Sequence, residues 1–148
     1  HAGIAIGSEI SGGVRRVFGE RCRMDSPELW YAIRFKNNAM RGGRLEDFWY
    51  RDIDVGQVGR AAITCDFNYT EGANGPFKPI LRNVNIERLR VAQATMVLDG
   101  QGLPGAPVEG LTIRDSSFLG VTKPSIVKHL NGLVLDNVRV NGAKVEAI

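Results

Sequence analysis

The chain has 148 residues, of which 43% are hydrophobic and 24% charged, and its formal net charge is +3. This length and apolar content fit a single folded domain over residues 1–148 and argue against a disordered chain. No apolar run approaches the roughly 18 residues needed to cross a membrane, and no basic run forms the stripe typical of nucleic-acid binding. We therefore expect neither a membrane nor a nucleic acid as partner.

Five segments share one template, in which apolar residues recur at offsets 0, 3, 5, 8 and 10. Every template position is apolar except Gly19 and Ser116. The steps of two predict strand alternation, and the steps of three indicate a bend between two strands. The other positions are mostly Arg, Asp, Glu and Asn and are expected to face water. In chain order the segments are VRRVFGERCRM (14–24), LEDFWYRDIDV (45–55), LRNVNIERLRV (81–91), VEGLTIRDSSF (108–118) and LNGLVLDNVRV (130–140).

A second, shorter apolar series alternates with the first. Strand-forming residues dominate both series, Gly and Asn separate the segments, and no stretch keeps a helical period. A repeat of this kind predicts an all-β solenoid, whose coils stack so that short parallel strands bury a continuous core. The segments of the second series are GIAIGSE (3–9), AIRFKN (32–37), AITCDF (62–67), TMVLDG (95–100) and SIVKHL (125–130).

The segment AIRFKN carries two cations within an apolar strand. Arg34 and Lys36 lie two residues apart, so their side chains share one face of the strand, and the alternating Ile and Phe point to the core. Stacking the apolar residues of GIAIGSE on this strand is expected to bring His1 beside Arg34. Three potentially cationic groups on one face predict an anionic ligand, and a guanidinium suits the two-point contact that a carboxylate offers.

The segments HAGIAIGSE and RFK resemble motifs of glycoside hydrolase family 28, the polygalacturonases and related pectin hydrolases. His1 would be the His of the family's Gly-His-Gly motif, with Ala2 replacing the second Gly. Arg34-Phe35-Lys36 would be its Arg-Ile-Lys motif, and the spacing between the two motifs fits. The resemblance implies a right-handed parallel β-helix, of which this chain would be the C-terminal half, truncated at its N-terminus.

The resemblance also implies an activity and the roles of four residues. The parent protein would be a glycosidase that hydrolyses galacturonate-containing pectic polysaccharide, such as pectin or an oligogalacturonide, with inversion. His1 would support catalysis, Arg34 and Lys36 would bind a galacturonate carboxylate, and Tyr69, in DFNYTEG, would contact a sugar. No cofactor and no metal are expected. A secreted or periplasmic location is expected, although the chain shows no signal peptide.

The catalytic aspartates of the family belong to Asn-Thr-Asp and Asp-Asp motifs, and neither motif occurs in this chain. An inverting glycosidase needs a carboxylic acid and a carboxylate roughly 6.5–9.5 Å apart. Asp66 and Asp99 end predicted strands, but each is expected to stand alone. We therefore expect the isolated chain to be inactive, and to self-associate through an open end coil.

Two other function classes fit the same architecture. A β-helix polysaccharide lyase needs a calcium site built from clustered acids, and the sequence shows no such cluster. A non-catalytic carbohydrate-binding or adhesive solenoid would bind polysaccharide without turnover. Trp30 and Trp49 are candidate sugar platforms, and Trp30 is favoured because it lies just before the strand that carries Arg34 and Lys36.

Overall fold

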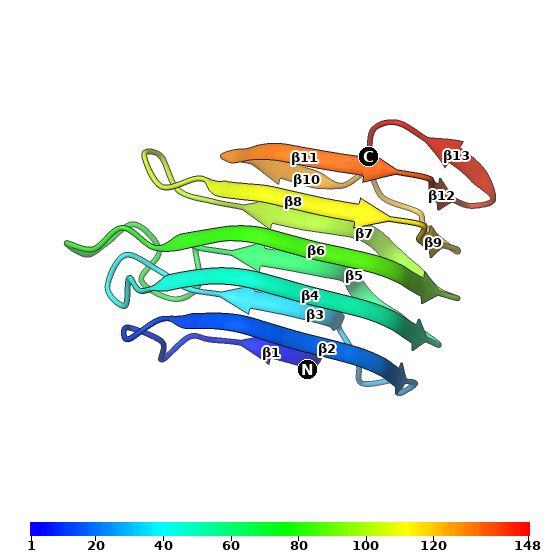
Figure 1. The fold of residues 1–148 in the computed structure, drawn as a ribbon, viewed down its shortest axis with the longest axis horizontal. Coiled ribbons are helices and arrows are strands. Elements are labelled where there is room, and N and C mark those ends of the chain that lie inside the picture. Colours follow the sequence, from blue (N-terminus) through cyan, green and yellow to red (C-terminus); the bar gives the residue numbers. More distant parts are fainter.

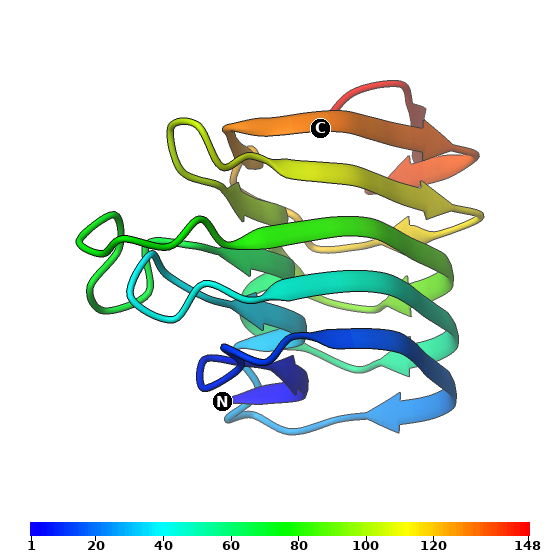
Figure 2. The same ribbon diagram turned by 60° about the vertical axis from the view of Figure 1, so that its left-hand side comes forward.

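The structure is a computed structural model that describes all residues from His1 to Ile148. It consists of strands joined by turns and loops, and it contains no helix of the length and apolarity needed to cross a membrane. The chain winds through successive coils that stack along one axis, and its two ends lie near opposite ends of the stack (Figures 1 and 2). The architecture is a parallel β-helix, as the repeats predict.

Two sheets enclose the core between them. Sheet one is parallel throughout, and sheet two is parallel except for a C-terminal antiparallel hairpin that the sequence did not predict. Sheet one consists of β1 (Ala2–Ile6), β3 (Tyr31–Lys36), β5 (Val58–Asp66), β7 (Ala94–Gln101) and β10 (Ile126–Lys128), in that order. Sheet two consists of β2 (Val14–Met24), β4 (Arg44–Val55), β6 (Ile80–Val91), β8 (Val108–Arg114) and β11 (Leu130–Asp136), together with β9 (Ser117–Phe118), β12 (Val138–Val140) and β13 (Ala143–Val145).

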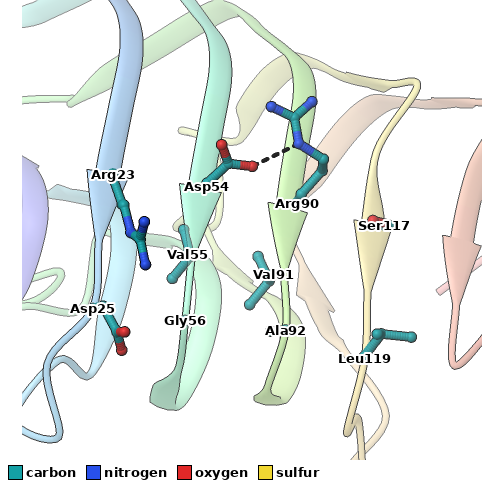
Figure 3. A pocket seen from close by; sticks show the side chains of 10 residues that line it. All are labelled: Arg23, Asp25, Asp54, Val55, Gly56, Arg90, Val91, Ala92, Ser117 and Leu119. Carbon is teal, nitrogen blue, oxygen red and sulfur yellow. Dashed lines mark hydrogen bonds and ion pairs between the residues drawn. The ribbon is translucent and has the colours of Figure 1, made fainter.

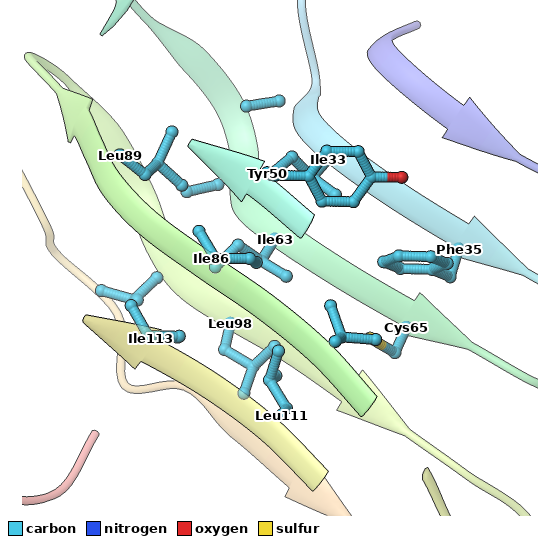
Figure 4. Packing of buried hydrophobic residues seen from close by; sticks show 14 of the residues in the cluster. Ile33, Phe35, Tyr50, Ile63, Cys65, Ile86, Leu89, Leu98, Leu111 and Ile113 are labelled. Carbon is cyan, nitrogen blue, oxygen red and sulfur yellow. The ribbon is translucent and has the colours of Figure 1, made fainter. Parts of the chain in front are cut away.

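The five template segments lie side by side in sheet two, and their apolar positions are in register. Tyr50, for example, pairs with Gly19 on one side and with Ile86 on the other. In β4 and β6 all template residues are buried, where they meet residues of sheet one such as Ile63 and Leu98 (Figure 4). The template is thereby confirmed, although β4 and β6 each continue as one strand across both bends.

The two exceptions to the template each have a physical reason. A Cβ atom at Gly19 would lie 2.7 Å from Cδ1 of Tyr50, so only glycine leaves room for that ring in the neighbouring coil. Ser116 is buried, but its hydroxyl donates to the Arg114 carbonyl at 2.7 Å and accepts the Leu89 N–H at 3.1 Å. A buried hydroxyl with both roles satisfied carries little penalty in a core.

Each coil bends twice in sheet two, and each bend is made by one residue in the left-handed region. These residues occupy offsets 2 and 7 of the template, with φ between 48° and 69°. Gly, Asn and Asp adopt this conformation readily, whereas other residues are strained there by roughly 1–2 kcal/mol. The ten residues are Arg16, Arg21, Asp47, Asp52, Asn83, Arg88, Gly110, Asp115, Gly132 and Asn137.

We expect Arg16→Asn to stabilise the protein by about 0.5–1 kcal/mol, because asparagine tolerates φ 56° better than arginine does. The new amide would also reach Asp47 in the next coil, as Asn83 does from the other side at 2.6 Å. Thermal or denaturant unfolding measures the change. Arg15→Asn is the control, since Arg15 is exposed but has no left-handed backbone, and an equal gain there would contradict the interpretation.

The outer face of sheet two carries a ladder of ion pairs between neighbouring coils. Arginines and acids alternate along the stack, so that opposite charges meet. The N–O distances are 2.6 Å for Arg51–Glu20, 2.7 Å for Arg88–Asp52, 2.6 Å for Arg90–Asp54 and 2.9 Å for Arg114–Asp136. Each exposed pair contributes at most about 1 kcal/mol, but a shift of one coil against the next would oppose like charges. The ladder therefore favours one register and leaves this face close to neutral.

Candidate functional site

The candidate site lies on the outer face of sheet one, and strand β3 supplies its two central cations. Ile33 and Phe35 are fully buried, while Arg34 and Lys36 alternate with them and point outward. The register of β1 on β3 is the one that the sequence predicts, with Ile4 opposite Ile33. The core residues of the strand thus hold the two cations on one face.

Two tyrosine rings enclose the Arg34 guanidinium. Its Cζ lies 4.8 Å from the centre of the Tyr31 ring and 5.5 Å from that of Tyr69, and the Lys36 Nζ lies 4.8 Å from the Tyr69 ring. Neither cation forms a salt bridge, and the buried Nε of Arg34 has no hydrogen-bond partner. Ring packing rather than a carboxylate holds the guanidinium, so its charge remains available to an external anion.

Asn38 positions the loop that carries Tyr69. Its buried side-chain amide donates to the Tyr69 carbonyl at 2.9 Å, to the Thr70 hydroxyl at 3.2 Å and to a Glu71 carboxylate oxygen at 2.7 Å. Its oxygen accepts backbone N–H groups of its own turn, including that of Arg41 at 2.9 Å. One side chain therefore ties the loop after β3 to the loop after β5, and the two loops place the Tyr69 ring over Arg34.

We expect Asn38→Ala to destabilise the protein by about 1–3 kcal/mol and to loosen residues 68–71, because three partly buried hydrogen bonds to that loop disappear. Amide hydrogen exchange of the loop measures the second effect. Asn38→Asp is the matched control: it keeps the acceptor for its own turn but loses the donors to the neighbouring loop. Unchanged exchange in both variants would contradict the positioning role.

His1 lies beside Trp30 and not beside Arg34, so that expectation is wrong. The His1 and Trp30 rings stack with centroids 5.8 Å apart and an interplanar angle of 10°. Arg34 pairs instead with Ala5, about 13 Å further along the strands at roughly 3.3 Å per residue. On the other side of Trp30, the Arg60 Cζ lies 4.4 Å from the indole ring. The structure thus brings Arg34, Lys36 and Tyr69 together. His1 stacks on Trp30 and is joined to them only through Arg60, which donates to the Tyr31 hydroxyl at 3.4 Å.

Hollows flank the Arg34–Tyr69 pair on both sides. One, of about 380 Å³, lies between Lys36, Tyr69 and the turn at residues 7–10. The other, of about 290 Å³, is lined by Tyr31, Arg60 and Asp99, among others. A hollow of about 380 Å³ also occurs at the end of sheet two, but there Asp25 and Asp54 balance the charges of Arg23 and Arg90, and Arg90 is paired with Asp54 (Figure 3). The cations that remain unpaired on sheet one make its outer face the better candidate.

Asp66 and Asp99 share this face, so the expectation that each stands alone is wrong. Asp66 pairs with Gln101, and Thr64 pairs with Asp99, which makes the two acids diagonal neighbours on adjacent strands. The Gln101 amide donates to Asp99 at 2.8 Å. Burial raises the pKa of Asp66, and the Asp99 charge adds to this rise, while the Asn68 N–H and the charge of Arg34 oppose it. The face therefore holds two interacting carboxyl groups beside the cations.

Comparison with known proteins gives relatives in sequence and in fold. No family model matches the chain. The chain is 28% identical over 114 residues to a probable polygalacturonase from Vitis vinifera, which covers 74% of the chain and 23% of that protein. It superposes with a TM-score of 0.84 and 26% identity on the crystal structure of a hyperthermoactive exopolygalacturonase from Thermotoga maritima, covering 99% of the chain and 32% of that structure. The chain is polygalacturonase-like.

The predicted resemblance to glycoside hydrolase family 28 and the predicted right-handed parallel β-helix are thereby confirmed. The polygalacturonase-like chain spans less than a third of the length of either relative. The roles of His1, Arg34, Lys36 and Tyr69 stay predictions, since a match in sequence and fold does not assign them.

We expect Asp66→Asn to stabilise the polygalacturonase-like chain at pH 7, because the folded state there holds a carboxylate whose pKa burial has raised. The folded state binds this proton more tightly than the unfolded state, so stability falls as pH rises from the usual carboxyl pKa through the raised one. The stabilisation by Asp66→Asn should therefore vanish at pH values below the usual carboxyl pKa. Denaturant unfolding from pH 3 to pH 8 measures this gain in stability. Asp54→Asn is the control: because Arg90 lowers the pKa of the Asp54 carboxyl, this substitution should destabilise the protein at pH 7.

Sequence reasoning missed Tyr31 and Asn38, which complete the surroundings of Arg34. Tyr31 could have been found from its place on β3, because it lies three residues before Arg34 and one residue after Trp30. Asn38 follows Asn37 directly after a strand, a position where side-chain amides commonly bond to nearby backbone. Its bonds to a loop 31 to 33 residues away could not be read from the sequence.

Proposed function

We propose that this chain forms the part of a pectin-hydrolase groove that binds the carboxylates of galacturonate. The observation that carries the proposal is the pair Arg34 and Lys36, unpaired and adjacent under Tyr69, in a chain similar to polygalacturonases. A guanidinium forms two parallel hydrogen bonds with a carboxylate, and an ammonium adds a compact charge. The Tyr69 ring offers an apolar face to a sugar.

We also propose that the isolated chain does not hydrolyse its substrate. Hydrolysis with inversion needs an acid and a base in fixed positions, and no Asp-Asp or Asn-Thr-Asp motif occurs among these residues. The relatives are more than three times as long as the matched part, and their additional segments are where we place the catalytic carboxylates. In this proposal His1 supports those carboxylates, and the protein acts outside the cell or in the periplasm. Self-association of the isolated chain stays a prediction.

The test is binding and turnover of polygalacturonate by the chain and by the full-length protein, each beside an Arg34→Ala, Lys36→Ala variant. We expect the chain to bind oligogalacturonide without releasing reducing ends, and the full-length protein to release them. The double variant should lose most of the binding and most of the activity. Failure of the full-length protein on every pectic polymer would overturn the proposal.

The products distinguish the remaining classes. A hydrolase leaves a reducing end without ultraviolet absorbance, whereas a lyase leaves an unsaturated sugar that absorbs. A binding or adhesive solenoid would retain polygalacturonate without turnover, also as the full-length protein. Reducing ends that appear together with ultraviolet absorbance would assign the lyase class instead.

A further inference from the structure

An aromatic stack stands on the outer face of sheet two, on the other side of the core from Arg34. Phe18 on β2 pairs with Trp49 on β4, and Trp49 pairs with Asn85 on β6. The Phe18 and Trp49 rings stack with centroids 4.8 Å apart and an interplanar angle of 10°. Phe18 is 64% exposed. Because the three residues follow one another along the row, the indole face that does not meet Phe18 is turned toward Asn85.

A hollow of about 290 Å³ lies beside the two stacked rings, toward Asn85. It is lined by Phe18, Trp49, Tyr50, Arg51, Asn85 and Glu87. Ligand sites for small molecules begin at roughly 300 Å³, and they combine apolar and aromatic walls with a few placed polar groups. The hollow is at the lower limit of that size, and it combines the Phe18 and Trp49 rings with the polar groups of Arg51, Asn85 and Glu87.

The polar groups at its rim are held in place. Asn85 donates to the Asn83 side chain at 2.9 Å, which leaves the Asn85 oxygen free to accept. Arg51 uses Nε and one terminal nitrogen on Glu20, at 3.0 Å and 2.6 Å, which leaves its other terminal nitrogen free to donate. Glu87 is paired with Arg88. The rim thus offers donors and acceptors without a net charge.

We propose that this hollow binds a neutral sugar residue of a polysaccharide, with the sugar ring stacked on Trp49. The ring C–H groups of a sugar form an apolar face that suits an aromatic ring, and its hydroxyl groups both donate and accept hydrogen bonds. Phe18 stacks on the indole and also borders the hollow. The charges around the hollow are balanced by ion pairs, unlike those of the outer face of sheet one, so the ligand is neutral. The site is independent of the function proposed for Arg34 and Lys36.

A second copy of the chain fits this face less well. Stable interfaces bury about 800 Å² on each partner, and the contiguous apolar part here is confined to two rings, since Asn85 and Thr112 separate them from the exposed Val134. The neighbouring rows are charged, and desolvating ion pairs costs free energy that is recovered only with excellent geometry. A sugar covers the rings without covering the ion pairs.

Tryptophan fluorescence of the full chain in a Trp30→Phe background tests the proposal, because Trp49 is then its only tryptophan. The probes are neutral β-1,4-galactan, arabinan and xyloglucan, with polygalacturonate as the acidic comparison. We expect saturable change with at least one neutral polymer, insensitive to 0.5 M salt. Retardation of the protein in gels that contain this polymer gives the binding affinity. We expect this affinity to fall at least about tenfold in Trp49→Ala and by a smaller factor in Asn85→Ala.

Val134→Ala is the matched control, since Val134 lies in the same row and is 48% exposed but lies two strands beyond Asn85. Arg34→Ala with Lys36→Ala should leave binding of the neutral polymer unchanged. No response to any neutral polymer, or undiminished retardation of Trp49→Ala, overturns the proposal. A concentration-dependent dimer that Trp49→Ala abolishes, without polymer binding, overturns it in favour of a second copy.

Discussion

Arg34→Ala should weaken the binding of oligogalacturonide by about 10–100-fold, the range expected when a charge-assisted hydrogen bond worth about 1.5–3 kcal/mol is removed. Arg34 is held between Tyr31 and Tyr69 and forms no salt bridge within the protein, so its guanidinium is available to a ligand. Calorimetric titration of the chain measures the affinity. The affinity should also fall with added salt, as expected for an exposed charge pair.

Arg34→Lys separates charge from shape. Lysine keeps the charge but loses the planar fork that meets a carboxylate at two points, so we expect a loss of affinity smaller than that of Arg34→Ala and no more than about tenfold. Arg114→Ala is the matched control, since Arg114 is an exposed arginine of sheet two that is paired with Asp136 at 2.9 Å. Full affinity in Arg34→Lys would show that two-point contact is not used, and a loss in Arg114→Ala would point to net charge alone.

Most of the fold could be predicted from the sequence because the inward positions repeat. Strand alternation and the bends determine which residues of each template segment point inward, and both are local properties of the chain. The bends are less visible, because Arg16, Arg21 and Arg88 occupy left-handed positions where glycine or asparagine would be expected. The C-terminal hairpin depends on how β13 folds back on β12, and the short segment carries no periodic signal.

The site was harder to predict because it joins segments that are distant in the sequence. Arg34 and Lys36 follow from alternation within one strand. The position of His1 also follows from the sequence, because the predicted pairing of Ile4 with Ile33 places His1 opposite Trp30. The approach of Asp66 to Asp99 depends on the register of β5 on β7, which shifts between Val58 and Ala61. Because the loops differ in length and β5 contains this irregularity, the register of β5 on β7 cannot be predicted by counting residues along the sequence.

Phe48→Ala should destabilise the protein by about 3–5 kcal/mol, the range for truncating a fully buried aromatic ring. Phe48 is fully buried between the sheets, where its ring meets Phe35 edge-on at 4.9 Å and stacks near Tyr50 at 6.3 Å. The neighbouring coils are held by their own strand pairing and cannot close the cavity. Denaturant unfolding measures the loss, and a loss of this size is a large fraction of the stability of a typical domain.

Phe18→Ala is the matched control for Phe48→Ala, because both residues lie on neighbouring strands of sheet two but on opposite faces. Phe18 is 64% exposed and loses only its stacking on Trp49, so its truncation should destabilise the protein by no more than about 1 kcal/mol. A strand that slipped by one residue would exchange the two faces and place Trp49 in the core. Equal losses in the two variants would therefore contradict the register on which the whole stack depends, and with it the outward direction of the aromatic pair.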